Sequence, residues 1–175
     1  MHQNNQPVEW VKRFAGIVPE YGPVLDLACG GGRHGRFLME LGHPVTFVDR
    51  NVTGLGDIAG LGEAVIIETD LETGSSWPQQ LVQTKFAGIV VVNYLHRPHF
   101  PMIVESLTAG GVLIYQTFAQ GNEKYGQPSN PDFLLRENEL MEYFGKDLDV
   151  VEFEQGFFQE PKPAVIQKIC ACKNC

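Results

Sequence analysis

Residues 24–35 read VLDLACGGGRHG, an apolar strand pattern that runs into a glycine-rich turn and then into a helix. Gly30, Gly32 and Gly35 have the G-x-G-x-x-G spacing of a turn that binds a dinucleotide or a similar ligand. Glycine lets the backbone approach a ligand closely, and the start of the following helix offers N–H groups. The same stretch contains Asp26, a carboxylate that would repel a pyrophosphate and would suit a ligand with a cationic amine.

Strand-like and helix-like segments alternate on both sides of this turn. The patterns predict helices over 7–18, 33–42, 97–111 and 132–145, a helix or loop over 51–62, a loop with a short helix over 71–85, and strands over 23–29, 43–49, 63–70, 86–95, 112–118, 148–158 and 164–172. The last two strands are too close in sequence for a parallel crossover. We therefore expect an α/β fold: a doubly wound, mostly parallel seven-stranded sheet with an antiparallel C-terminal hairpin and helices on both faces.

The length of 175 residues fits one domain, over 1–175. Within it we expect an N-terminal cap helix over 1–20 and a lid loop over 119–132. The net charge of −8 and the lack of a Lys/Arg cluster argue against nucleic acid as a partner. No apolar run is long enough for a membrane span, and the polar N-terminus lacks a secretory core, so we expect a cytoplasmic protein. In that compartment the cysteines are expected to be free thiols, and the C-x-C-x-x-C at 170–175 to be a frayed strand end instead of a metal site.

Two acids lie at the ends of successive predicted strands. Asp49 ends the second strand and Asp70 ends the third. One acid at such a position binds ribose hydroxyls in either kind of nucleotide site, and a second suits an adenine amine one strand further along. The alternative is that both residues cap the segments that follow.

The glycine turn, Asp49, Asp70 and the closing hairpin together resemble the class I S-adenosylmethionine-dependent methyltransferases, over about residues 20–172. Within that class, GRHGRFLMELGHPVTFVDRN is similar to the small methyltransferases of the tellurite-resistance and thiol-methylating kind. The resemblance implies that Ala28–Gly32 lie under the methionine part of the cofactor, with Asp26 near its amine, Asp49 at the ribose, Asp70 and Leu71 at the adenine, and Asn93 and Tyr94 beside the methyl donor. The residues that it implies for cofactor binding are Asp26, Ala28, Cys29, Gly30, Gly32, Asp49, Arg50, Asp70, Leu71, Asn93 and Tyr94.

The implied reaction is direct in-line methyl transfer from S-adenosylmethionine to a small molecule, for which positioning supplies much of the rate. The stretch NYLHRPHF (93–100) contains the candidate catalytic residues His96 and Tyr94, and Arg97 is a candidate for holding an anionic substrate. His96 is equally compatible with a helix cap or with packing under the loop. Position alone adds candidate substrate contacts at Tyr115, Phe118, Asn122 and Tyr125. Trp10 is a further candidate, because the short chain leaves the N-terminal helix to help cover the acceptor pocket.

Two other functions stay open on the sequence. A nicotinamide-dependent oxidoreductase is compatible with the G-x-G-x-x-G turn and an acid after it. A non-catalytic domain that binds a cofactor or a partner is compatible with the same fold. The stretch 93–100 departs from the D/N-P-P-Y/F pattern of enzymes that methylate the amino groups of nucleic acids, which again argues against DNA or RNA as substrate.

Overall fold

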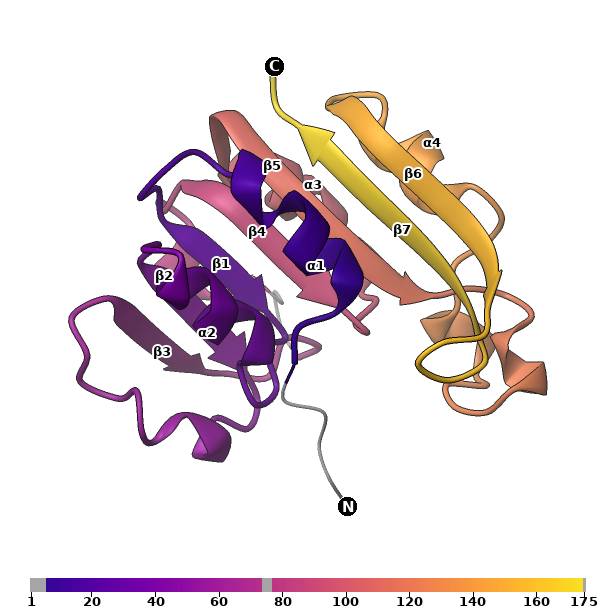
Figure 1. Ribbon diagram of the computed structural model, residues 1–175, viewed down its shortest axis with the longest axis horizontal. Coiled ribbons are helices and arrows are strands. Elements are labelled where there is room, and N and C mark those ends of the chain that lie inside the picture. The colour runs from indigo at the N-terminus through magenta and orange to yellow at the C-terminus, as the bar shows by residue number, and fades with distance from the viewer. Residues whose placement is uncertain (1–5, 74–76, 175) are drawn as a thin grey trace.

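The computed structural model describes residues 6–73 and 77–174. In this part of the chain seven strands form one sheet with the order β3-β2-β1-β4-β5-β7-β6 (Figure 1). The strands are β1 (Val24–Leu27), β2 (Val45–Asp49), β3 (Ala64–Glu68), β4 (Phe86–Val92), β5 (Leu107–Phe118), β6 (Asp149–Phe158) and β7 (Ala164–Cys172). Strands β1 to β5 pair in parallel, and β7 runs antiparallel between β5 and β6. The expected fold class, including the closing hairpin, is confirmed.

Helices cover both faces of this sheet (Figure 1). The α-helices are α1 (Glu9–Phe14), α2 (Arg33–Glu40), α3 (Phe100–Ser106) and α4 (Glu139–Phe144), and short 3-10 turns extend or connect them. Helices α1 and α2 lie on one face, where Trp10 and Leu38 belong to one buried cluster with alternate strand residues. Helices α3 and α4 lie on the other face, where Phe100 and Phe144 belong to a second cluster. Strand β4 is buried along its whole length because both of its faces are covered.

The order of the sheet fixes where a ligand can bind. The chain crosses from β3, at one edge, back to β4 beside β1, so the strand order reverses between β1 and β4. Ligands of doubly wound sheets bind beyond the carboxyl ends of the strands at this switch point. The turn after Leu27 and the segment after Val92 meet there, because Leu27 pairs with Val91 in the register of the two strands.

The predicted helix over 97–111 is wrong at its end, where α3 stops at Ser106 and β5 already begins at Leu107. The residues Thr108–Gly111 belong to the strand, at a shift in register between Phe86 and Gly88 of β4. Gly110 has a φ of +74°, and a Cβ on Gly111 would lie 2.9 Å from the Thr108 carbonyl oxygen. The two glycines therefore form an irregularity inside a strand, where the sequence suggested a helix stop.

The predicted helix over 132–145 is also too long. Residues Pro131–Phe133 form a 3-10 turn, and α4 begins only at Glu139. The cap is Asn130, whose side chain accepts from the Asp132 N–H, and not Asp132 itself. The helix predicted over 7–18 is α-helical over Glu9–Phe14 and continues as a 3-10 turn over Ala15–Ile17. The strand predicted over 86–95 ends at Val92, because Asn93 turns the chain with a φ of +58°.

Three further expectations concern cysteines, metals and membranes. Cys29 and Cys170 are free, whereas Cys172 is disulfide-bonded, contrary to the expectation for it; Cys175 lies outside the described residues. Within 6–73 and 77–174, three or more His, Cys, Asp or Glu side chains nowhere gather in a way that would hold a metal ion. The helices of these same ranges are all too short or too polar to span a bilayer.

Candidate functional site

The glycine turn presents an open backbone surface at the carboxyl end of β1. Ala28, Gly30 and Gly32 all have positive φ, at +55°, +54° and +74°. A Cβ added to Gly30 or Gly31 would meet nothing within 4 Å, whereas one on Gly32 would lie 2.5 Å from Leu55. Gly32 is thus required for packing, and Gly30 and Gly31 leave room for a ligand.

Asp49 joins the end of β2 to this turn. One carboxylate oxygen accepts from the Gly30 N–H at 2.8 Å, and the other accepts from the Asn51 N–H at 3.0 Å. Each carboxylate oxygen has a second lone pair, so Asp49 retains acceptor capacity toward ligand hydroxyls. The bond to Asn51 shows that Asp49 also forms the local turn that the alternative interpretation expected.

Asp70 and Leu71 follow the neighbouring strand, β3. The Thr69 N–H donates to the Asp49 carbonyl at 3.0 Å, which brings the two acidic segments together. Asp70 is exposed and accepts from the Glu72 N–H at 2.9 Å, and Leu71 is buried. This arrangement places Asp49 and Asp70 at adjacent strand ends, as predicted. Their contacts with ribose and adenine stay predictions.

Asp26 lies underneath the turn instead of on its surface. Its side chain is 1% exposed, and Oδ2 accepts from the Gly35 N–H in the first turn of α2 at 2.8 Å. Gly35 is required there, because a Cβ would lie 2.2 Å from the Phe47 ring. Burial raises the pKa of Asp26 to about 7, against the opposing effect of the Gly35 N–H and with a further rise from Asp49. The contact that the structure shows for Asp26 is with the start of α2, and its role near a ligand amine stays a prediction.

The raised pKa of Asp26 makes stability depend on pH. Between the ordinary carboxyl pKa near 3.8 and the folded value of about 7, the folded chain holds a proton that the unfolded chain has lost. Stability therefore falls as the pH rises through this window. Asp26→Asn keeps an acceptor for the Gly35 N–H and cannot ionise. We expect the unfolding free energy of this variant, minus that of the wild type, to increase by a few kcal/mol between pH 4 and pH 8.

Urea denaturation across that pH range measures the difference. A difference in unfolding free energy that is the same at every pH reflects the replacement of the carboxyl group by an amide. Only the change of this difference with pH tests the prediction. Asp147→Asn, at an exposed carboxylate before β6, is the matched control and should give a flat difference. Parallel curves for Asp26→Asn and the wild type would show that Asp26 is not a strained carboxylate.

A pocket of about 220 Å³ opens beside the turn, at the carboxyl ends of β4 and β5. It is lined by Glu72, Asn93, Tyr94, Leu95, Thr117, Phe118, Pro128 and Phe133. Asn93, Tyr94 and Phe118 were predicted from sequence. Pro128 belongs to the predicted lid loop over 119–132. Glu72, Thr117 and Phe133 were not predicted, although Glu72 comes two residues after Asp70 and Phe133 one residue after that loop. Leu95 carried no signal, since it reads as one more apolar residue of a buried strand.

Tyr94 forms the wall of this pocket and anchors the segment that follows β4. Its carbonyl oxygen accepts from the Tyr115 hydroxyl at 2.8 Å. Its own hydroxyl oxygen is buried and has no hydrogen-bond partner among the described residues. Burial raises the pKa of this phenol, and the negative charges of Glu72, Asp70 and Asp49 add to the rise. Tyr94 is therefore a neutral phenol at ordinary pH, and its part in catalysis stays a prediction.

His96 is half-buried beside the pocket, in an aromatic group with Tyr94 and His99. The ring centroids of His96 and His99 are 4.5 Å apart, and those of His96 and Tyr94 are 6.5 Å apart. His96 is not one of the pocket-lining residues. This packing matches the alternative that the sequence left open, and the role of His96 as a base stays a prediction.

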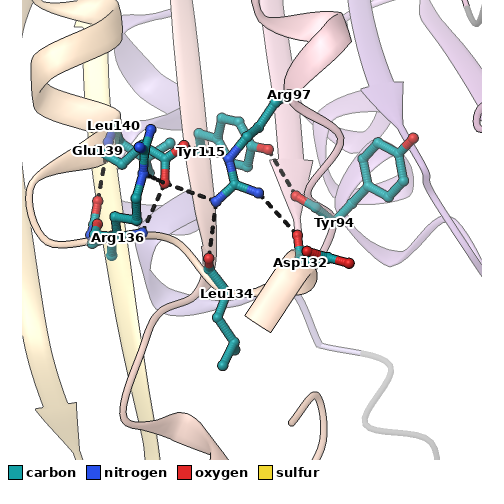
Figure 2. Close-up of polar contacts among 9 residues, drawn as sticks. Tyr94, Arg97, Tyr115, Asp132, Leu134, Arg136, Glu139 and Leu140 are labelled. Atoms are coloured by element: carbon teal, nitrogen blue, oxygen red, sulfur yellow. Dashed lines mark hydrogen bonds and ion pairs between the residues drawn. The ribbon is translucent and has the colours of Figure 1, made fainter. Parts of the chain in front are cut away.

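Arg97, expected to hold an anionic substrate, is instead paired with Glu139 and bonded to two main-chain carbonyls (Figure 2). Its Nε and Nη2 donate to the two carboxylate oxygens of Glu139 at 2.6 and 2.9 Å. Nη1 donates to the Asp132 carbonyl and Nη2 to the Leu134 carbonyl, both at 3.0 Å. Glu139 is buried and also accepts from the Arg136 N–H at 2.8 Å. We call Arg97, Glu139 and the two carbonyls the Arg97 clasp; it holds the segment over 131–139 against the segment after β4.

Three other predicted substrate contacts also have internal partners. Tyr115 is 1% exposed and packs between Phe100 and Phe144. Trp10 is buried on the opposite face, where its Nε1 donates to the Ile169 carbonyl at 3.2 Å. Asn122 is buried and accepts from the Val165 N–H at 3.1 Å. These three residues hold the fold and do not line the pocket.

The remaining predicted residues divide by exposure. Tyr125 is exposed, with its ring 4.8 Å from that of Phe157 on β6. Arg50 is exposed beside Asp49. Cys29 is buried in the turn, and burial raises the pKa of its thiol well above the usual range. Cys29 therefore stays a neutral thiol that fills space.

Comparison with known proteins agrees with this geometry. A family model described as "Tellurite resistance protein TehB" matches residues 9–161. A probable S-adenosyl-L-methionine-dependent methyltransferase TehB of Haemophilus influenzae is 29% identical over 139 residues, which is 76% of this chain and 48% of that protein. The chain thus spans about half the length of the curated relatives that it matches.

Two solved structures share the fold. The crystal structure of TehB from H. influenzae has a TM-score of 0.74 at 22% identity, with 94% of this chain and 61% of that one covered. The second is a 1,6-didemethyltoxoflavin-N1-methyltransferase from Burkholderia thailandensis, solved with bound 1,6-didemethyltoxoflavin and S-adenosylhomocysteine. Its TM-score is 0.70 at 16% identity, with 95% of this chain and 79% of that one covered.

Proposed function

Because this chain belongs to the TehB family of S-adenosylmethionine-dependent methyltransferases, we propose that it transfers a methyl group directly, in line, to a small-molecule acceptor. The resemblance seen in the glycine turn and the two acids is confirmed, and with it the cofactor of the family, S-adenosylmethionine. The observation that carries the proposal is the open turn at Gly30 and Gly31 with Asp49 bonded to it, next to an aromatic pocket. A cytoplasmic location is part of the same proposal.

The charges of the site fit this cofactor better than a nicotinamide dinucleotide. Asp26 lies underneath the turn, Asp49 is bonded to it, and Asp70 and Glu72 follow the end of β3. The carboxylates of Asp49, Asp70 and Glu72 favour a ligand that carries a positive sulfonium and amine, and they repel a pyrophosphate. The N–H groups of Gly30 and Gly35 are already bonded to Asp49 and Asp26, so the turn has fewer donors for a phosphate than its sequence suggested.

The residues of the site bind and orient the reactants. When bound, the cofactor supplies an electrophilic methyl group on a sulfonium. Asp49 is placed to accept from the ribose hydroxyls, and Ala28–Gly32 to lie under the methionine part. The pocket holds the acceptor at the end of β4, so that its lone pair forms the new bond as the carbon–sulfur bond breaks. Fixing this geometry replaces a bimolecular encounter by an oriented one, which accounts for much of the rate.

Titration calorimetry with S-adenosylmethionine, S-adenosylhomocysteine and NADH tests the proposal. We expect both sulfur compounds to bind and NADH not to bind. Binding of NADH alone would favour the oxidoreductase. A non-catalytic domain would bind the cofactor and transfer no labelled methyl group to any acceptor of a broad panel.

The loop over 119–132 is part of the proposal as a cover for the pocket. Its ends are tied down by a bridge between Ala119 and Leu135 and by Asn122, whose Nδ2 donates to the Pro128 carbonyl at 3.1 Å. Residues 123–131, all exposed except the half-buried Pro128, form the tip of the loop. We expect the amides of the tip to exchange quickly in the free protein and several-fold more slowly with S-adenosylhomocysteine bound. Hydrogen exchange with mass spectrometry measures this, and unchanged exchange at saturating ligand would identify a static turn.

A further inference from the structure

We propose that Arg36 is a positioning residue for the cofactor, because it ties the segment that follows β2 to the glycine turn that follows β1. This inference rests on the proposed methyltransferase function and concerns the two halves of its cofactor site. One half is the turn Ala28–Gly32, proposed to lie under the methionine part, and the other is Asp49, proposed to bind the ribose. Arg36 acts on both halves through their backbone and not through a contact with the ligand.

The guanidinium of Arg36, on α2, bonds to both segments at once. Its Nε donates to the Gly31 carbonyl in the turn at 3.3 Å, and its Nη2 donates to the Gly54 carbonyl at 2.9 Å. Nη1 and Nη2 also donate to the two carboxylate oxygens of Asp57, at 2.7 and 2.6 Å. We call Arg36 with these three partners the Arg36 tie. A planar guanidinium carries its N–H donors in a rigid fork and so fixes the spacing of its acceptors, whereas an ammonium group on a flexible stem does not.

The segment that Arg36 holds is rich in glycine and lies outside the sheet. After Asp49 the chain leaves β2, and residues 51–62 contain four glycines, which give the backbone wide conformational freedom. Leu55 anchors the inner side of this segment, because its side chain is fully buried. On the outer side the segment approaches the turn so closely that a Cβ added to Gly54 would lie 3.6 Å from the Cα of Gly31. The Arg36 tie fixes this close approach and with it the spacing of the two segments.

The exposure of the tie indicates that it positions the segments more than it stabilises the fold. The side chain of Asp57 is 67% exposed and that of Arg36 is 28% exposed. Ion pairs in contact with water contribute little to stability. Without Arg36, the sheet and the bond between Asp49 and the Gly30 N–H remain, but the outer part of the segment is no longer held against the turn. We therefore expect the loss of Arg36 to change the spacing of the two segments and to leave the protein folded.

A ligand that spans both segments depends on their spacing, whereas a ligand that contacts one segment does not. S-adenosylhomocysteine is proposed to reach the turn with its amino-acid part and Asp49 with its ribose. Two linked parts reinforce each other only where the geometry lets both bind at the same time. Adenosine uses the ribose and adenine side alone. The affinity of the whole ligand relative to that of adenosine therefore reports the spacing, and a general loss of stability would not change this ratio.

Titration calorimetry with S-adenosylhomocysteine and with adenosine, on the full chain, tests the inference in Arg36→Met and Arg36→Lys. We expect both variants to bind S-adenosylhomocysteine about tenfold more weakly than the wild type and to bind adenosine within about twofold of it. Lysine keeps the positive charge and loses the fork, so an equal loss in both variants separates geometry from charge. Arg13→Met removes an exposed ion pair with Glu152, between α1 and β6, and is the matched control that should leave both affinities unchanged.

Three outcomes of the titrations would overturn the inference: unchanged affinity for S-adenosylhomocysteine in Arg36→Met, an equal loss of affinity for adenosine, or full affinity in Arg36→Lys. Urea denaturation of each variant checks that the fold is retained. Asp57→Ala removes only the exposed partner of the tie and gives the same comparison should Arg36→Met not fold. We expect it to weaken S-adenosylhomocysteine about threefold and to leave adenosine unchanged.

Hydrogen exchange of the free protein tests the tie without any ligand. The amides of Ile58 and Ala59 both donate to the Leu55 carbonyl, next to the tie. We expect them to exchange several-fold faster in Arg36→Met than in the wild type, and equal rates would overturn the inference. Failure of S-adenosylhomocysteine to bind the wild type would instead contradict the proposed function, and the exchange rates would still report whether Arg36 holds the segment.

Discussion

Asp49→Ala is expected to weaken the binding of S-adenosylhomocysteine by about 100-fold. The carboxylate has two effects on the site. It is placed to accept from the ribose hydroxyls, where a hydrogen bond to a charged group contributes about 1.5–3 kcal/mol. It also holds the glycine turn through the Gly30 N–H at 2.8 Å. Alanine removes both, and titration calorimetry measures the sum.

The two effects separate in the variant Asp49→Asn. Its amide oxygen still accepts from the Gly30 N–H, while the charge and one acceptor are lost. We expect an affinity between those of the wild type and Asp49→Ala. Asp147→Ala removes an exposed carboxylate near the start of β6, at the opposite edge of the sheet, and serves as the control. Full affinity in Asp49→Ala would exclude the ribose role and leave Asp49 as a turn residue.

The parts of the site that the sequence predicts are those set by local pattern. The turn around Gly30 and the acids at Asp49 and Asp70 are each tied to the end of one strand, and parallel strands bring their carboxyl ends to one edge. The period of the apolar residues was enough to place them. The local pattern gives the wrong element at Thr108–Gly111. Two consecutive glycines are compatible both with the end of a helix and with an irregularity inside a strand.

The parts that the sequence does not predict depend on contacts between distant residues. Arg97 reads as a free cation near the reaction centre because its partner, Glu139, is 42 residues away in an apparently ordinary helix. Tyr115 reads as a polar group at a strand end, and its burial follows from α3 and α4 covering that face. Phe133 reads as part of a helix until the Arg97 clasp fixes the backbone on both sides of it.

Arg97→Met is expected to lower the unfolding free energy by about 3–5 kcal/mol at pH 7, because it leaves a buried carboxylate without its main partner. Glu139 is 7% exposed in its side chain, whereas Arg97 is 35% exposed. Burial acts to raise the pKa of Glu139, and the hydrogen bonds from Arg97 and from the Arg136 N–H outweigh it, so the net pKa lies below the usual range. In the wild type this group therefore stabilises the fold above its unfolded pKa and loses that effect as the pH falls.

The variant reverses this dependence on pH. Without Arg97, burial dominates and the pKa of Glu139 rises above its unfolded value. The loss of unfolding free energy caused by Arg97→Met is then largest near pH 7. It becomes smaller as the pH falls, because the carboxyl group of Glu139 takes up a proton. Urea denaturation at pH 7 and pH 5 should show that the difference in unfolding free energy between the wild type and Arg97→Met is smaller at pH 5. Arg97→Met combined with Glu139→Gln removes both charges and should be more stable at pH 7 than Arg97→Met alone, since the buried charge is what costs stability. A gap that does not change with pH, or a double variant no more stable than the single one, would mean that the clasp acts through its bonds to the Asp132 and Leu134 carbonyls and not through the ion pair.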